Sequence, residues 1–122
     1  MKNNLFLFAL LVLLISACSS KGNDNGSIVT GDVKEFKMTA KQFAFEPSVI
    51  EVNKGDKVRL IVTSVDVPHG FSIPEFGINE RLDVGKPVTI EFVADKQGSF
   101  TAFCSVFCGS GHGNMKGKIV VK

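Results

Sequence analysis

Apolar and polar residues alternate with a period of two along much of the chain from about residue 33 onward. Phe36, Met38 and Ala40 are separated by Lys and Thr, and the same alternation runs through residues 58–62 and 88–92. Successive side chains of a β-strand point to opposite faces of its sheet, so this pattern predicts half-buried strands. No stretch of this region has the apolar spacing of an amphipathic helix.

Clusters of turn-forming residues separate the predicted strands. Asn, Asp, Gly and Pro gather at three such places, residues 53–56, 84–87 and 95–98. Six to eight short strands at this spacing, the last at 117–121, predict an all-β fold of the Greek-key sandwich or barrel type. We expect the phenylalanines to dominate its core, and we assign no function to Phe43 or Phe45.

The first residues show a different pattern, in which Lys2 precedes an unbroken apolar run over residues 5–15. This run is shorter than the about 20 residues that span a bilayer, and the small residues Ser and Ala follow it. The arrangement predicts a signal peptide over residues 1–17 and export to the periplasm or the cell exterior. Residues 18–32, rich in Ser, Gly, Asn and Asp, predict a flexible tether, so we place one folded domain at 33–122.

The segment 14–18, Leu-Ile-Ser-Ala-Cys, resembles the bacterial lipobox, in which small residues precede a lipidated cysteine. The resemblance implies that Cys18 becomes the lipid-bearing mature N-terminus and anchors the protein to a membrane. The alternative is an ordinary cleavage site, which would leave Cys18 as an unpaired thiol in an exported protein. With Cys18 assigned to lipid, the mature domain keeps two cysteines, Cys104 and Cys108.

The charge balance excludes one class of function. The formal net charge is +2, and loss of residues 1–17 removes only Lys2. A protein that binds nucleic acid needs a concentrated basic surface. We therefore expect no nucleic-acid partner.

The stretch 104–115 concentrates side chains that can bind metal ions. It carries Cys104, Cys108, His112 and Met115, and His69 lies upstream. Thiolate, imidazole and thioether together favour copper, because soft sulfur stabilises Cu(I) while nitrogen keeps Cu(II) accessible. Zinc fits less well, because zinc sites more often use closely spaced cysteine pairs and gain little from a thioether.

One cysteine, two histidines and a methionine would already satisfy a mononuclear blue-copper site, so the second cysteine is additional. Two thiolates on one short loop can instead bridge two copper ions, each with one imidazole as its terminal ligand. In that arrangement Met115 is a weak ligand of one ion, and the backbone carbonyl of Val106 is our candidate for the other. The residue types and spacing leave both arrangements open.

Two interpretations without a metal also exist. Cys104 and Cys108 could form a disulfide in an oxidising compartment, although this would leave Met115 and both histidines unexplained. Cys108 and His112 could form a thiolate pair for nucleophilic catalysis. Nothing else in the chain resembles a group that would orient such a pair.

The pattern C-x3-C-x3-H-x2-M at 104–115, together with residues 66–71 and 115–121, resembles the CuA domain of haem-copper oxidase subunit II. The resemblance runs from about residue 43 to the end of the chain. It implies a cupredoxin-like fold and an electron-transfer centre of two copper ions. The implied copper ligands are His69, Cys104, the Val106 carbonyl, Cys108, His112 and Met115.

Two features depart from that family pattern. Many members carry Glu where this chain has Val106, so here only the backbone carbonyl can act on a metal ion. Members also commonly have an aromatic patch, often with Trp, at which electrons arrive, whereas this chain has neither Trp nor Tyr. Lipid on Cys18 would replace the N-terminal membrane helices of that subunit, although it supplies no helix contacts.

The resemblance implies an electron relay or shuttle. It would take electrons from a cytochrome c or a small cupredoxin and pass them to a membrane terminal oxidase, with the oxidase catalytic subunit as a further partner. We expect no catalysis by the chain alone, because nitrous oxide reductase, which has a similar domain, builds its catalytic cluster from many histidines and this chain has two. The alternatives are a copper storage or delivery protein and a mononuclear cupredoxin.

Overall fold

The computed structural model describes residues 33–122, which form nine β-strands and two short 3-10 helices. The elements are β1 (Val33–Lys41), β2 (Ala44–Glu46), β3 (Val49–Val52), β4 (Lys57–Ser64), β5 (His69–Ile73), η1 (Pro74–Phe76), β6 (Ile78–Leu82), β7 (Val88–Val93), β8 (Gly98–Phe103), η2 (His112–Asn114) and β9 (Lys116–Val121). Among the described residues, no helix has the length and apolar character needed to cross a bilayer. The predicted signal peptide, the lipidation of Cys18 and the tether lie outside these residues.

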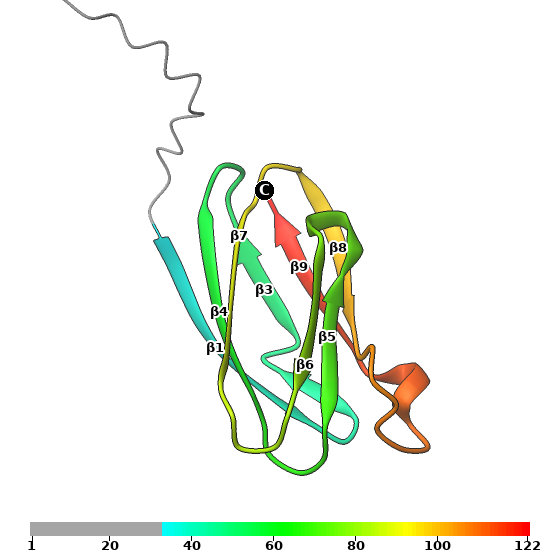
Figure 1. Cartoon of the computed structure of the whole chain (residues 1–122). Helices are drawn as coiled ribbons and strands as arrows, with labels where there is room; N and C mark the ends of the chain where they lie inside the picture. Colours follow the sequence, from blue (N-terminus) through cyan, green and yellow to red (C-terminus); the bar gives the residue numbers. More distant parts are fainter. Residues whose placement is uncertain (1–32) are drawn as a thin grey trace, which may run out of the picture.

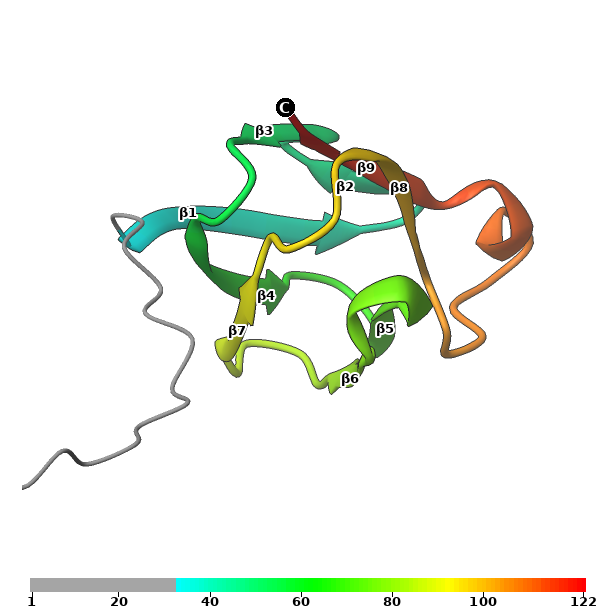
Figure 2. The same ribbon diagram turned by 90° about the horizontal axis from the view of Figure 1, so that it is seen from above.

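The strands form two sheets that face each other across the core (Figure 1, Figure 2). One sheet has the order β2-β1-β4-β7 and the other the order β3-β9-β8-β5-β6. The β1–β4 and β3–β9 pairs are parallel, and the remaining neighbours are antiparallel. The predicted all-β sandwich is confirmed. The strand count exceeds the predicted six to eight because β2 and β3 have only three and four residues, too few for alternation to show.

Alternation places one face of each long strand in the core. In β4, Val58, Leu60 and Val62 are fully buried. Arg59, between two of them, points outward and forms ion pairs with Glu35 on β1 and Glu91 on β7. The period of two seen in the sequence therefore reflects strands with one buried and one solvent-facing side.

The phenylalanines do not dominate the core, so that expectation was wrong. Among the phenylalanines of residues 33–122, only Phe45 and Phe71 are fully buried, with their rings edge to face at 5.3 Å. Phe76 packs against Phe92 and Phe100 in a partly exposed cluster. Facing sheets are only about 10 Å apart, so aliphatic side chains fill most of that space and several large rings lie at its margin.

Two connections meet at the end of the domain opposite the C-terminus (Figure 1). Residues 65–68 join β4 to β5, and residues 104–115 join β8 to β9. The strand β5 follows the first connection and β8 precedes the second, and these two strands are neighbours, with Ser72 opposite Phe103. All five residues of β5 are buried. The first of them, His69, is thus held rigidly beneath the loop that carries the cysteines.

Candidate metal centre

The loop 104–115 is closed at its base and folded on itself. The Cys104 N–H donates to the Met115 carbonyl at 3.1 Å, where β8 gives way to the loop and the loop to β9. Three further backbone bonds tighten its second half, from His112 to Gly109, from Asn114 to Gly111 and from Met115 to His112. This compact turn directs both cysteine side chains inward.

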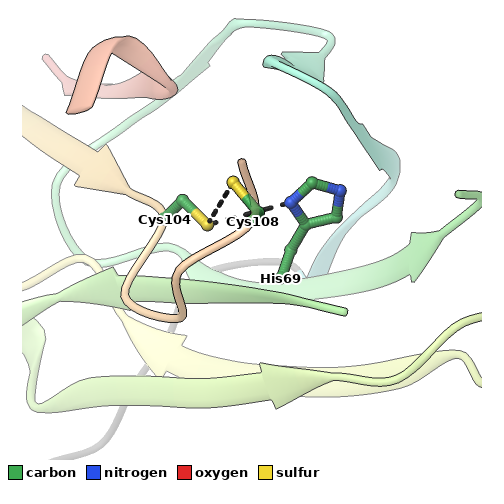
Figure 3. Close-up of side chains that lie close together, drawn as sticks. All are labelled: His69, Cys104 and Cys108. Carbon is green, nitrogen blue, oxygen red and sulfur yellow. Dashed lines mark hydrogen bonds between the residues drawn. The ribbon is translucent and has the colours of Figure 1, made fainter. Parts of the chain in front are cut away.

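Both thiols are buried and free, with their sulfur atoms 3.5 Å apart (Figure 3). A disulfide bond requires about 2.05 Å between sulfurs, so Cys104 and Cys108 are not bonded to each other. His69 completes a cluster in which the ligand atoms all lie within 4.8 Å of one another. This spacing leaves room for metal ions between the sulfurs and the imidazole.

Each thiol faces one imidazole nitrogen. The Nδ1 atom of His69 lies 3.8 Å from the Cys104 sulfur, and the Nδ1 atom of His112 lies 3.6 Å from the Cys108 sulfur. Each of the two histidines therefore lies beside a different thiol of the pair. The structure brings together two residues that are 43 positions apart in the sequence.

The two predicted weak ligands follow the same division. The Val106 carbonyl oxygen lies 3.1 Å from the Cys104 sulfur, and the Met115 sulfur lies 3.8 Å from the Cys108 sulfur. Met115 is fully buried. All six donor groups expected from the sequence thus gather at one place.

A carboxylate orients the His69 ring from behind. Nε2 of His69 is 2.8 Å from Oδ1 of Asp66. In the tautomer in which Nε2 carries the proton and donates a hydrogen bond to this carboxylate, Nδ1 keeps the lone pair that faces the thiols. Desolvation by burial works to raise the pKa of Asp66, but hydrogen bonds from Gln42, His69 and Val67 outweigh it and leave the pKa below its ordinary value. Asp66 therefore stays an acceptor for the imidazole at neutral pH.

The two imidazoles differ in their access to solvent. His69 is completely buried, whereas His112 is only partly buried. The Phe107 ring packs on His112 with 5.5 Å between ring centroids, and 78% of Phe107 is exposed. The site therefore has one sealed side and one side that reaches the surface through His112 and Phe107.

The Cys108 thiol is neutral while no cation is near. Burial, and next the neighbouring Cys104 thiol, raise the pKa of Cys108 to about 11. Two adjacent buried thiolates would repel each other, so Cys104 and Cys108 would lose their protons only together with the binding of a metal cation. Soft sulfur donors combined with two imidazoles match copper better than a hard cation. The residues present thus fit a copper site.

Close packing against glycines holds the site together. A Cβ atom on Gly70 would lie 2.8 Å from the Val106 nitrogen, and a Cβ atom on Gly111 would lie 2.4 Å from the Phe43 ring. Gly109 has φ of +134°, a value that other residues rarely adopt. Sequence reasoning gave Phe43 no role and did not consider Gln42, although both lie directly against this loop.

A two-sheet sandwich with thiol, imidazole and thioether donors gathered at one end defines the cupredoxin class of copper-binding proteins. The chain belongs to the cupredoxin-like domain family, which matches residues 5–121. His69 and the two cysteines can bind copper in this family context. The predictions of a cupredoxin-like fold and of copper as the metal are confirmed.

Two relatives place the chain more narrowly. It is 32% identical over 103 residues to nitrous-oxide reductase of Cupriavidus necator. The matched region covers 81% of this chain and 16% of that protein. It is 38% identical over 80 residues to cytochrome c oxidase subunit 2 of Thermus thermophilus. The matched region covers 66% of this chain and 59% of that subunit. The chain thus spans less than two thirds of the length of either relative. The predicted resemblance to CuA domains is confirmed.

Solved structures agree with this placement. A heme-copper terminal oxidase dimer superimposes with a TM-score of 0.67 at 29% identity, over 73% of this chain and 65% of that chain. The periplasmic domain of subunit II of cytochrome oxidase from Bradyrhizobium japonicum gives 0.63 at 28% identity, over 72% of this chain and 83% of that chain. The similarity covers most of the described domain.

Proposed function

We propose that the chain is an electron-transfer protein whose centre is a pair of copper ions bridged by Cys104 and Cys108. The observation that supports this most is the pair of free, buried sulfurs 3.5 Å apart, each facing its own imidazole. A mononuclear site needs only one thiolate. The terminal ligands in this proposal are His69 and His112, and the weak ligands are Met115 and the Val106 carbonyl.

When bound, the copper pair would supply a one-electron redox couple, and the protein residues keep its surroundings fixed. Asp66 holds the tautomer and direction of His69 through Nε2. Met115 and the buried thiols exclude water from the inner side. Electrons would cross at the outer side, where His112 and the exposed Phe107 lie at the surface.

The experiment that tests this function measures copper content and the EPR spectrum of the reconstituted protein. We expect two copper ions per chain and the hyperfine pattern of one unpaired electron shared by two copper nuclei. A single copper with a single-nucleus pattern would exclude the proposal and favour a mononuclear cupredoxin. Normal loading with negligible electron exchange with a haem protein would favour copper storage or delivery.

We further propose that the domain receives electrons from a cytochrome c or a small cupredoxin and passes them to a membrane terminal oxidase. The relatives that support this are an oxidase subunit and a solved heme-copper oxidase. Export would put the domain on the side where such donors move, and lipid on Cys18 would keep it at the membrane. Labelling with a radioactive fatty acid, lost in Cys18→Ala, would test the anchor.

Replacing Met115 with Leu should leave two copper ions bound and shift the reduction potential. Leu fills a similar volume in this fully buried position, so the fold and the bridging sulfurs are kept. The weak ligand of a copper site tunes its reduction potential, so loss of the thioether changes the potential without removing a bridging or terminal ligand. Voltammetry with copper analysis checks this, with Met38→Leu in β1, a buried methionine of the core, as the control. A Met115→Leu potential equal to wild type would remove Met115 from the ligand set.

Replacing Phe107 with Ala should slow electron exchange with reduced cytochrome c without changing the copper content. A largely exposed aromatic ring beside a ligand suits a contact residue. The few residues that dominate an interface each cost more than about 1 kcal/mol when truncated, so for Phe107 in that role we expect roughly fivefold weaker binding or more. Stopped-flow mixing checks this. The control is Val33→Ala, which trims another exposed apolar residue at the start of β1. Equal rates in both variants would argue against docking at Phe107.

A further inference from the structure

Gln42 contacts both segments that carry the candidate ligands. It lies in the turn after β1, and its side-chain Nε2 donates a hydrogen bond to the Cys108 carbonyl at 2.7 Å. Its backbone N–H donates to Oδ2 of Asp66 at 2.7 Å. One residue therefore bridges the cysteine loop and the connection that precedes His69.

The second of these bonds continues to the metal centre. Asp66 accepts from Gln42 with one carboxylate oxygen and faces Nε2 of His69 with the other, at 2.8 Å. A continuous path of hydrogen bonds thus runs from the Cys108 carbonyl through Gln42 and Asp66 to the His69 ring. Its two ends belong to segments that are 39 positions apart in the chain.

Packing fixes the Gln42 amide in this position. A Cβ atom on Gly109 would lie 2.9 Å from Nε2 of Gln42, and one on Gly111 would lie within 2.4 Å of the Phe43 ring. The turn 42–43 is therefore in close contact with the glycine side of the loop. Although much of Gln42 is exposed, its amide end is held between the Cys108 carbonyl and Gly109.

We propose that Gln42 is a positioning residue, which sets the Cys108 sulfur and the His69 imidazole at their mutual distance by tying their backbone supports together. The proposal rests on the proposed function in so far as these two side chains bind copper. Gln42 acts through Cys108 and Asp66 and touches no metal ion itself. Groups that orient ligands in this way commonly change metal affinity by about 10–100-fold when they are removed.

Two substitutions separate hydrogen bonding from packing. Gln42→Glu keeps the size of the side chain but places an oxygen, in place of the donor, against the Cys108 carbonyl. Gln42→Ala removes the side chain and keeps the backbone N–H that bonds to Asp66. Gln97→Ala is the matched control, because Gln97 is the other glutamine and lies exposed in the turn before β8.

The first measurement uses the metal-free protein and NMR. In wild type we expect the Gln42 side-chain amide protons to be well dispersed and protected from exchange. We expect Gln42→Glu to shift the backbone resonances of Cys108, Gly109 and His69, whereas Gln97→Ala leaves them unchanged. Unshifted resonances in Gln42→Glu would overturn the proposal. Because no copper is present, this result stands even if the wild-type protein binds no copper pair and the proposed function fails.

The second measurement uses the copper-loaded protein. We expect copper to pass to a Cu(I) chelator about tenfold faster from Gln42→Glu than from wild type, with a changed EPR hyperfine splitting. Gln42→Ala should show the same direction, and Gln97→Ala should match wild type. A wild-type release rate and spectrum in Gln42→Glu, with a change only in Gln42→Ala, would mean that Gln42 fills space, and would overturn the proposal. If Gln42→Ala does not fold, Gln42→Glu alone decides.

Discussion

Replacing Cys104 or Cys108 with Ser should reduce the copper content from two ions to at most one and remove the spectrum of a shared electron. A serine hydroxyl is a hard donor that stays protonated at neutral pH, so it cannot bridge two soft ions as a thiolate does. The remaining sulfur still has an imidazole within 4 Å in either variant, since each sulfur faces its own histidine. Metal analysis and EPR of the reconstituted variants measure the effect.

The control for this pair of variants is Ser110→Ala, which changes an exposed side chain of the same loop. It should keep both copper ions. Full copper content in either cysteine variant would contradict the bridging role. So would equal and complete loss of copper in both cysteine variants and in Met115→Leu, because that result would assign a weak ligand the same weight as a bridging one.

Replacing Gly70 with Ala should destabilise the fold and displace the cysteine loop. The new Cβ atom would lie 2.1 Å from Oγ of Ser105 and within 2.9 Å of two backbone nitrogens of that loop. A side chain can rotate away, but the backbone of the ligand loop cannot. Overpacking of this kind typically costs about 1–3 kcal/mol, which lowers the Tm of a domain of this size by about 4–8 °C for each kcal/mol.

Thermal unfolding of the metal-free protein and copper titration together measure the Gly70→Ala effect. We expect a lower Tm and weaker copper binding, because the Gly70 N–H also lies 3.5 Å from the Cys104 sulfur. Gly113→Ala is the matched control, since a Cβ atom there meets nothing within 4 Å. A Gly70→Ala variant with the Tm and copper affinity of Gly113→Ala would show that β5 and the loop can move apart freely.

The sequence alone revealed most donor groups because most of them are neighbours in the chain. Cys104, Cys108, His112 and Met115 lie within twelve residues, so their spacing carries the chemistry. His69 could be assigned only because so few imidazoles exist in the chain and because the surrounding residues resemble a known family. The structure then placed its Nδ1 atom 3.8 Å from Cys104.

The supporting contacts could not be predicted in the same way. Gln42 reaches Cys108 across 66 positions, and the parallel alignment of β1 with β4 places it beside Asp66 in the connection that follows β4. An exposed glutamine after a strand has no distinctive sequence signal. The phenylalanines misled for a related reason, since period-two alternation shows which face a residue occupies but not how far it lies from the middle of a narrow sandwich.

A hydrogen bond from the Cys104 N–H to the Met115 carbonyl closes the cysteine loop where β8 ends and β9 begins. Its ends leave adjacent strands whose pairing runs from Phe103 opposite Lys116 up to Gly98 opposite Val121. The register of β8 and β9 is thus set by bonds that lie below the metal-bearing segment. The strands therefore fix where the loop begins and ends, while its contacts with Gly70 of β5 and with Gln42 constrain how it folds between those two points.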